Sequence, residues 1–201
     1  MMMNDMLKKY NNSSLKDTSK DKKEYMTNSE KIKVINFDNL SKKGYSKMLR
    51  LKGQSFPFKT NDALYLDVEN NKFIFIEFKN GSFSVNEKNF KEKELPQLEL
   101  KIIGSMYILQ EITGKSFKEL REITDYILVY NKEKNPHIFS AVDMGNYIVN
   151  LGTLNNKKIR NLKEGISFGL EKFKGYCFKN VHTYLKEEFE EKFVRKYEKL
   201  K

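Results

Sequence analysis

Two strongly apolar segments of strand length, joined by a short polar turn, constrain the fold of this chain more than any other feature. Residues 62–68 read DALYLDV, and residues 72–79 read KFIFIEFK. The intervening residues 69–71 read ENN, and asparagine tolerates the positive φ angles that tight turns require. The pattern therefore predicts a β-hairpin. A strand as apolar as the second one is typical of the centre of a sheet, where a charge is costly unless it is paired or metal-bound.

Charged residues nevertheless stand at three positions of the predicted hairpin: Asp62, Glu77 and Lys79. We expect a two- or four-residue loop that places Asp62 opposite Lys79 and Leu64 opposite Glu77. Because side chains alternate along a strand, the three charged residues then share one face of the sheet. Asp62 and Glu77 become diagonal neighbours, close enough to hold one ion. A three-residue loop would break this arrangement.

Two carboxylates at this separation suit the hard cations Mg²⁺ and Mn²⁺. Such an ion polarises a phosphoryl oxygen and generates hydroxide from water near neutral pH. Lys79 can orient that water or stabilise the charge that develops on the phosphate. The alternative interpretation is structural, in which Lys79 forms a salt bridge with Asp62 or Glu77 at the end of an ordinary hairpin.

The hairpin resembles the core of the PD-(D/E)xK nuclease superfamily, over about residues 32–131. Asn61-Asp62 leads one strand, and Glu77-Phe78-Lys79 lies on the next. The resemblance implies a restriction-endonuclease-like αβββαβ core and metal-dependent phosphodiester hydrolysis, the activity of an endonuclease or other nuclease. It further implies a metal held by Asp62, Glu77 and the backbone carbonyl of Phe78, with Lys79 assisting the reaction.

The sequence departs from the superfamily pattern in two places. Asn61 stands where the name-giving proline often lies. Many members also carry an acid on the first helix, but residues 41–51 contain none, and Glu30 and Asp38 are the nearest candidates. A catalytically silent module that binds nucleic acid or a protein partner therefore stays open as an alternative, in a defence, anti-defence or toxin-related role.

The remaining elements predict an α/β fold with a mixed central sheet, flanked by helices and extended by a C-terminal helix. The chain divides into a flexible basic leader, residues 1–30, and a single nuclease-like domain, residues 31–201. The expected strands are residues 31–37, 82–85, 126–130 and 178–184, and the expected helices are residues 41–51, 98–112 and 186–199.

The net charge of +11 favours partners that carry negative charge, with nucleic acid, DNA or RNA, as the first choice. The first 60 residues hold +8 of this charge. Lys47 and Arg50 on the first helix, and Lys101 on the second, are candidate phosphate contacts, and Ser105 is a candidate partner of Glu77 or of a metal-bound water. The alternative for each is an ordinary solvated polar surface.

The chain contains one cysteine, Cys177, so a disulfide within the chain is excluded. No run of 18 apolar residues and no apolar signal core is present, which indicates a cytoplasmic protein without a membrane partner. Many enzymes of the resembled kind cut as dimers, so a homodimer is one option that the sequence leaves open.

Overall fold

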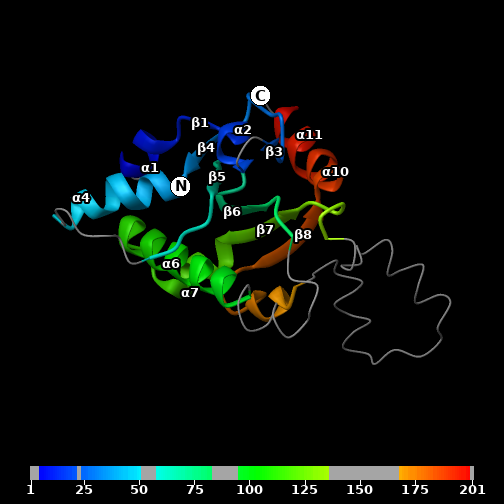
Figure 1. Ribbon diagram of the computed structural model, residues 1–201. Helices are drawn as coiled ribbons and strands as arrows, with labels where there is room; N and C mark the ends of the chain where they lie inside the picture. The colour runs from blue at the N-terminus through cyan, green and yellow to red at the C-terminus, as the bar shows by residue number, and fades with distance from the viewer. Residues whose placement is uncertain (1–4, 22–23, 51–57, 83–94, 136–167, 200–201) are drawn as a thin grey trace.

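A computed structural model of the chain describes residues 5–21, 24–50, 58–82, 95–135 and 168–199. Figure 1 shows a central sheet with α6 and α7 on one side and the C-terminal helices α10 and α11 on the other. The sheet has six strands in the order β1-β4-β5-β6-β7-β8. Strands β1, β4, β5 and β6 pair antiparallel, whereas β6, β7 and β8 pair parallel. The predicted α/β fold with a mixed central sheet is therefore confirmed.

The predicted hairpin forms the two central strands of the sheet, β5 and β6. The six strands have the following bounds: β1 (Ser13–Ser14), β4 (Lys33–Asn36), β5 (Ala63–Asp67), β6 (Lys72–Lys79), β7 (Thr124–Tyr130) and β8 (Asn180–Leu185). Every residue of β5 and β7 is buried, as is every residue of β6 except its two ends. This burial explains the nearly continuous apolar sequence of all three strands. Of the predicted strand 82–85, residues 83–85 lie outside the described residues, and Ser82 is not in a strand.

The hairpin turn is a four-residue loop, residues 68–71, closed by the pair Asp67 and Lys72. The carboxylate of Asp67 accepts a hydrogen bond of 3.1 Å from the backbone N–H of Asn70. Asn71 has φ 53°, a conformation that asparagine adopts more readily than most residues. The side chain of Asp67 therefore helps to fix where the loop begins.

This loop shifts the strand register by two residues from the expected one. Leu64 pairs with Phe75, not with Glu77, so the predicted pairing is wrong. Continuing the observed register by one step places Asp62 directly opposite Glu77 instead of diagonal to it. Because the shift is an even number of residues, Asp62, Glu77 and Lys79 still belong to the same face of the sheet.

Helices α6 (Leu95–Thr113) and α7 (Phe117–Ile123) connect the parallel strands β6 and β7. The prediction of a helix over residues 98–112 is confirmed, with Pro96 in the first turn. Helix α7 is not among the helices predicted from the sequence. It begins with a capping box in which Ser116 and Glu119 satisfy each other's backbone N–H groups.

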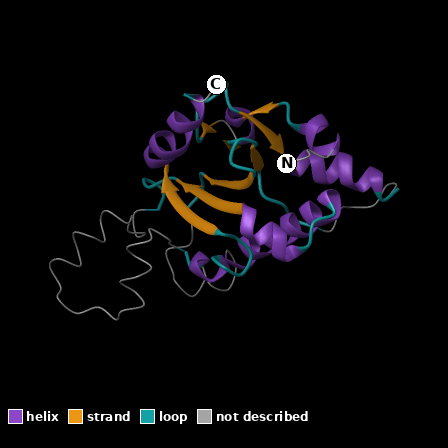
Figure 2. Ribbon diagram, turned by 180° about the vertical axis from the view of Figure 1, so that it is seen from behind, coloured by secondary structure: helices purple, strands orange, loops and turns teal. Residues whose placement is uncertain are grey.

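The core consists of two layers, one on each face of the sheet. One face packs against α6 through residues such as Ile102, Met106 and Leu109. The other packs against a continuous helical segment composed of α10 (Lys186–Phe189), η4 (Glu190–Val194) and α11 (Arg195–Glu198). Figure 2, seen from behind, shows the strands between these two sets of helices. The C-terminal segment agrees with the helix predicted for residues 186–199.

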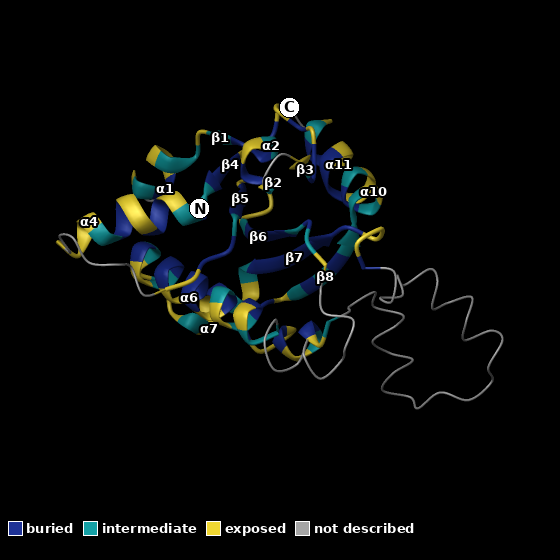
Figure 3. Cartoon of the chain, viewed as in Figure 1, coloured by how far each residue is buried: buried dark blue, intermediate teal, exposed yellow. Residues whose placement is uncertain are grey.

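The described amino-terminal residues, 5–21 and 24–30, pack against the rest of the fold, in the region for which the sequence predicts a flexible leader. The described part contains α1 (Asp5–Tyr10), α2 (Leu15–Thr18) and a small hairpin of β2 (Lys20–Asp21) and β3 (Glu24–Tyr25). Its scattered apolar residues Leu7, Leu15 and Met26 are all buried. Figure 3 shows the buried positions of this segment over the sheet.

The helical segment before β5 consists of α3 (Phe37–Asn39), η1 (Leu40–Tyr45) and α4 (Ser46–Met48). It starts earlier than the helix predicted for residues 41–51, because the Asn36 side chain caps it by accepting from the N–H of Asn39. Among the described residues, no helix is both long and apolar enough to cross a membrane.

Candidate functional site

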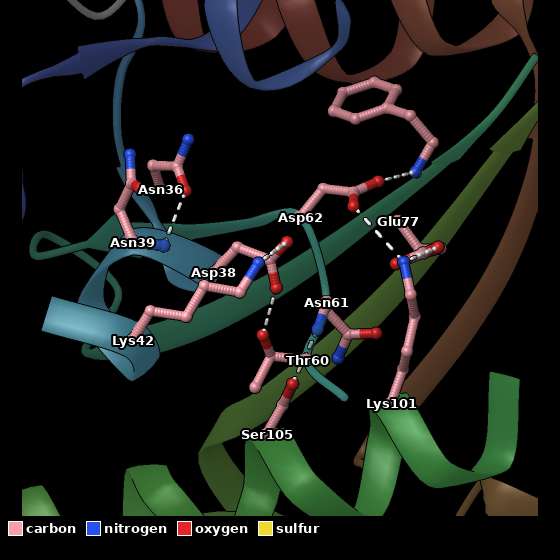
Figure 4. A network of polar contacts seen from close by, with 11 residues as sticks. Asn36, Asp38, Asn39, Lys42, Thr60, Asn61, Asp62, Glu77, Lys101 and Ser105 are labelled. Atoms are coloured by element: carbon pink, nitrogen blue, oxygen red, sulfur yellow. Dashed lines mark hydrogen bonds and ion pairs between the residues drawn. The ribbon is translucent and has the colours of Figure 1, made fainter. Parts of the chain in front are cut away.

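The candidate site lies where the sheet meets the first turns of α6, and two carboxylates form its base. Asp62 directly precedes β5, and Glu77 lies near the end of β6. Oδ2 of Asp62 accepts a hydrogen bond of 2.7 Å from the backbone N–H of Phe78, which ties the Asp62 side chain to the neighbouring strand. Figure 4 shows the two carboxylates side by side.

Glu77 is the more buried member of the pair, with a residue exposure of 3%. Its Oε2 atom is buried and has no hydrogen-bond partner among the described residues. A buried carboxylate oxygen without a partner is costly. Among the described residues, Oε2 of Glu77 is therefore an acceptor whose capacity is unused.

Lys101 extends from α6 into the carboxylate pair (Figure 4). Its Nζ lies 2.5 Å from Oε1 of Glu77 and 3.3 Å from Oδ1 of Asp62. The sequence predicted Lys101 as a phosphate contact, and in the structure it forms ion pairs with the two acids. The side chain is 26% exposed, so it borders solvent on one side.

Burial dominates the electrostatics of the pair. It raises the pKa of Glu77 to about 8, and the nearby charge of Asp62 adds to this effect. Burial also raises the pKa of Asp62. Burial opposes the charge of Lys101, but Glu77 and Asp62 outweigh it, so the pKa of Lys101 is raised. Near neutral pH, these directions give an ionised Lys101 beside a Glu77 that retains its proton.

Ser105 contacts the backbone next to the site but is not part of the described lining of the cleft. Its Oγ accepts a hydrogen bond of 2.8 Å from the backbone N–H of Asn61, and the residue is fully buried. The predicted contact of Ser105 with Glu77 or a metal-bound water is therefore not the one observed. Instead, Ser105 fixes the backbone immediately before Asp62.

Gly104 allows the same segment to approach α6 closely. A Cβ atom at this position would collide with the carbonyl oxygen of Lys59 and would lie 3.3 Å from the Cβ of Phe58. Any side chain would push residues 58–61 away from the helix. Gly104 and Ser105 together therefore set the position of Asp62 relative to Lys101.

The carboxylates open into a cleft of about 350 Å³. Its walls come from three parts of the chain that are far apart in sequence: the amino-terminal segment, the end of β6 and the start of α6. The lining residues are Thr18, Ser19, Lys20, Asp21, Asp62, Glu77, Phe78, Lys79, Gln97, Leu98 and Lys101. The structure thus brings Asp62, Glu77, Phe78 and Lys79 together, as the sequence predicted.

Two predicted nucleic-acid contacts lie elsewhere. Lys47 in α4 and Arg50 just beyond it are exposed, and neither belongs to the described lining of the cleft. Residues 18–21, in contrast, line the cleft, although no sequence pattern placed them there, because their position depends on tertiary packing. Gln97 also lines the cleft, and its spacing of four residues from Lys101 on the predicted helix indicated that the two face the same way.

Two further acids, Asp38 and Glu30, are the nearest ones that the sequence offers from the first helix or before it. Asp38 in α3 accepts a hydrogen bond from the Thr60 hydroxyl and lies 3.4 Å from Nζ of Lys42. Its charge contributes to the raised pKa values of Asp62 and Glu77, so it lies near the pair, but it is already partnered. Glu30 is exposed and pairs with Lys16. Within the described residues, no cluster of three or more His, Cys, Asp or Glu side chains is arranged to hold a metal.

The donor atoms of the cleft nevertheless fit a hard divalent cation. The carbonyl of Lys79 accepts from the N–H of Asn131, toward β7. Because backbone groups alternate along a strand, the carbonyl of Phe78 faces the opposite edge, where its N–H meets Asp62. The two carboxylates, which include the unpartnered oxygen of Glu77, and this carbonyl supply the all-oxygen ligands that Mg²⁺ or Mn²⁺ requires, provided that the Lys101 ammonium moves aside.

No family model, curated protein or solved structure matches this chain. The geometry of the cleft is therefore the basis on which a function can be assigned.

Proposed function

We propose that this chain is a metal-dependent nuclease that hydrolyses phosphodiester bonds in DNA or RNA. The observation that carries the proposal is the buried pair of Asp62 and Glu77, which lines a cleft together with Lys79 and Lys101 and leaves Oε2 of Glu77 without a partner among the described residues. Carboxylates are rarely buried together unless a cation compensates them. A cleft that combines acids for a cation with lysines for an anion suits a phosphate group bound beside a metal.

Each residue of the site has a role in this proposal. Asp62, held by the Phe78 N–H, and Glu77 would hold Mg²⁺ or Mn²⁺, together with the carbonyl of Phe78. When bound, the ion supplies Lewis-acid chemistry and lowers the pKa of water. Lys79 would position the attacking water, and Lys101, released from the acids, would stabilise negative charge on the phosphate.

The order of elements supports the same class of enzyme. Antiparallel strands β4, β5 and β6 are followed by α6 and by the parallel strand β7. This order is compatible with the αβββαβ core that the resemblance to PD-(D/E)xK nucleases implies, with α3, η1 and α4 inserted between β4 and β5. A cytoplasmic location and a homodimer stay predictions.

A catalytically silent binding module is the second candidate. It is favoured by one observation, namely that Lys101 already neutralises the two acids. This alternative predicts salt-sensitive nucleic-acid binding without turnover. Charge reversal at Lys42, Lys43 and Lys47 would weaken nucleic-acid binding but would leave a purely protein-binding module unaffected.

A cleavage assay tests the proposal. Plasmid DNA, single-stranded DNA and tRNA are incubated with Mg²⁺, Mn²⁺ or EDTA, using wild type, Glu77→Gln and Glu99→Gln. Glu99 is a matched control because it lies in α6, pairs with Lys172 and does not line the described cleft. Cleavage that EDTA and Glu77→Gln abolish, and Glu99→Gln retains, is expected. Intact substrates under every metal would favour the binding module.

A further inference from the structure

The amino-terminal segment forms one wall of the cleft. Residues 18–21 line it together with the end of β6 and the first turns of α6. The carboxylates therefore lie at the base of a cleft with walls on more than one side. Because Glu77 is only 3% exposed, a phosphate must enter the cleft to reach it.

This wall is fixed to the rest of the fold. The N–H of Leu15 donates to the carbonyl of Ile32 at 3.0 Å, and the N–H of Ser19 donates to the carbonyl of Leu15 at 3.1 Å. The Ser19 side chain accepts from the N–H of Thr27 at 3.2 Å. The hydroxyl of Thr27 in turn donates to Glu190 on the C-terminal helix at 2.5 Å. The position of Lys20 relative to the carboxylates is therefore set by ordered backbone and core contacts.

Lys20 is the exposed cation of this wall. Its Nζ lies 5.5 Å from the centre of the Tyr25 ring, which restricts the side chain without neutralising it. Among the described residues, the other lysines that line the cleft are Lys79 and Lys101. The lining acids are Asp21 beside Lys20 and the pair at the base. A phosphodiester backbone bound by Lys20 and Lys79 would therefore share the cleft with the carboxylates.

The size of the cleft limits what can follow this path. A volume of about 350 Å³ lies at the lower end of the range for small-molecule sites. It suits a unit of about one nucleotide, with neighbouring nucleotides along the walls. A cleft of this volume does not accommodate the second strand that a duplex carries, whereas a single strand can turn its bases outward.

We infer that the substrate of this site is a single strand of nucleic acid and that Lys20 binds its phosphate backbone. The inference rests on the proposed function for the chemistry at Asp62 and Glu77, but not for the binding itself. It assigns a specific residue and contact to the amino-terminal segment, for which the sequence suggested a basic arm that grips phosphates or a plain tail.

Lys16 provides a matched control for Lys20. Both lysines contact the same ring, since Nζ of Lys16 lies 5.4 Å from the centre of Tyr25. Lys16, however, pairs with Glu30 and does not line the described cleft. Lys16→Ala and Lys20→Ala therefore remove the same type of aromatic contact, and only the second removes a cation from the cleft.

The test is fluorescence anisotropy of a labelled oligonucleotide, alone or annealed to its complement, with Ca²⁺ in place of Mg²⁺. We expect tighter binding of the single strand by about tenfold, and weaker binding by Lys20→Ala of about tenfold. A plot of log affinity against log salt concentration has a negative slope, and for Lys20→Ala this slope should be shallower by about 0.7 than for the wild type. The reason is that the variant neutralises one phosphate fewer. Lys16→Ala should bind as wild type does.

Equal affinities of the two alanine variants, equal affinities for single strand and duplex, or no binding to either would overturn the inference. Because binding is measured without turnover, the two proposals fail separately. Absence of cleavage together with a Lys20-dependent preference for single strands would remove the nuclease and keep the inference. Cleavage without that preference would keep the nuclease and remove the inference.

Discussion

Nζ of Lys101 lies 2.5 Å from Oε1 of Glu77, so helix α6 delivers a cation to a carboxylate buried at the end of β6. The contact explains how two acids can lie together at the base of a cleft. It also means that a metal ion must compete with this lysine for the same oxygens. Whether Lys101 contacts the two acids therefore distinguishes the metal-free site from the metal-bound one.

Removal of the Lys101 ammonium should destabilise the metal-free protein. Lys101→Met leaves Asp62 and Glu77 without their counter-ion, which we expect to cost about 2 kcal/mol in the free energy of unfolding at pH 9. At pH 6 the cost should be smaller, because Glu77 can keep its proton. Urea denaturation in EDTA measures both values. Lys118→Met, at an exposed position of α7, is the control, and an equal loss in both variants would show that the contact contributes nothing.

The stability of the metal-free protein should fall as pH rises toward 8. Burial raises the folded-state pKa of Glu77 to about 8 from its ordinary 4.5. A raised pKa contributes stability that is complete below pH 4.5 and is lost as pH rises through the folded value. Relative to Glu77→Gln, the wild type should lose at most about 1.4 kcal/mol per pH unit across this window. Chemical denaturation of both proteins in EDTA checks the slope, and parallel curves would rule the effect out.

Gly104 should be required for the position of Asp62. Gly104→Ala places a methyl group against the Lys59 carbonyl, so we expect a loss of about 1–3 kcal/mol in stability as the segment before β5 shifts. Cleavage should fall with it, at temperatures where the variant is still folded. Gln110→Ala, in the same helix, controls for the alanine itself. Wild-type cleavage by a folded Gly104→Ala variant would show that this close approach is not needed.

The sequence predicted the elements whose patterns are strong. The hairpin, α6, β7 and the C-terminal helix all have a clear period of two, a clear helical period or a continuous apolar run, and each is present. The grouping of Asp62, Glu77 and Lys79 on one face also followed from the sequence. It depends only on whether the strand register is shifted by an even or an odd number of residues. The actual register did not follow, since it depends on the Asp67 side chain closing a four-residue loop.

Tertiary packing determines what the sequence could not provide. The amino-terminal segment has too few apolar residues to show a period, yet Leu7 and Leu15 each find a place in the core. Lys101 and Ser105 are four residues apart on one predicted helix, so both face the same way. Which of them meets the carboxylates depends on how α6 is placed against the sheet, and Gly104 sets that placement.

Metal binding by the carboxylate pair is the central claim, and calorimetric titration with Mn²⁺ at pH 8.5 tests it most directly. The wild type and Glu99→Gln should each bind Mn²⁺ at this site, and Glu77→Gln should bind it about 100-fold more weakly, because a ligand with an unpartnered buried oxygen is removed. Titration below pH 8 should release a proton from Glu77. Equal Mn²⁺ affinity in wild type and Glu77→Gln, or no binding by the wild type, would contradict the assignment of Asp62 and Glu77 as a metal site.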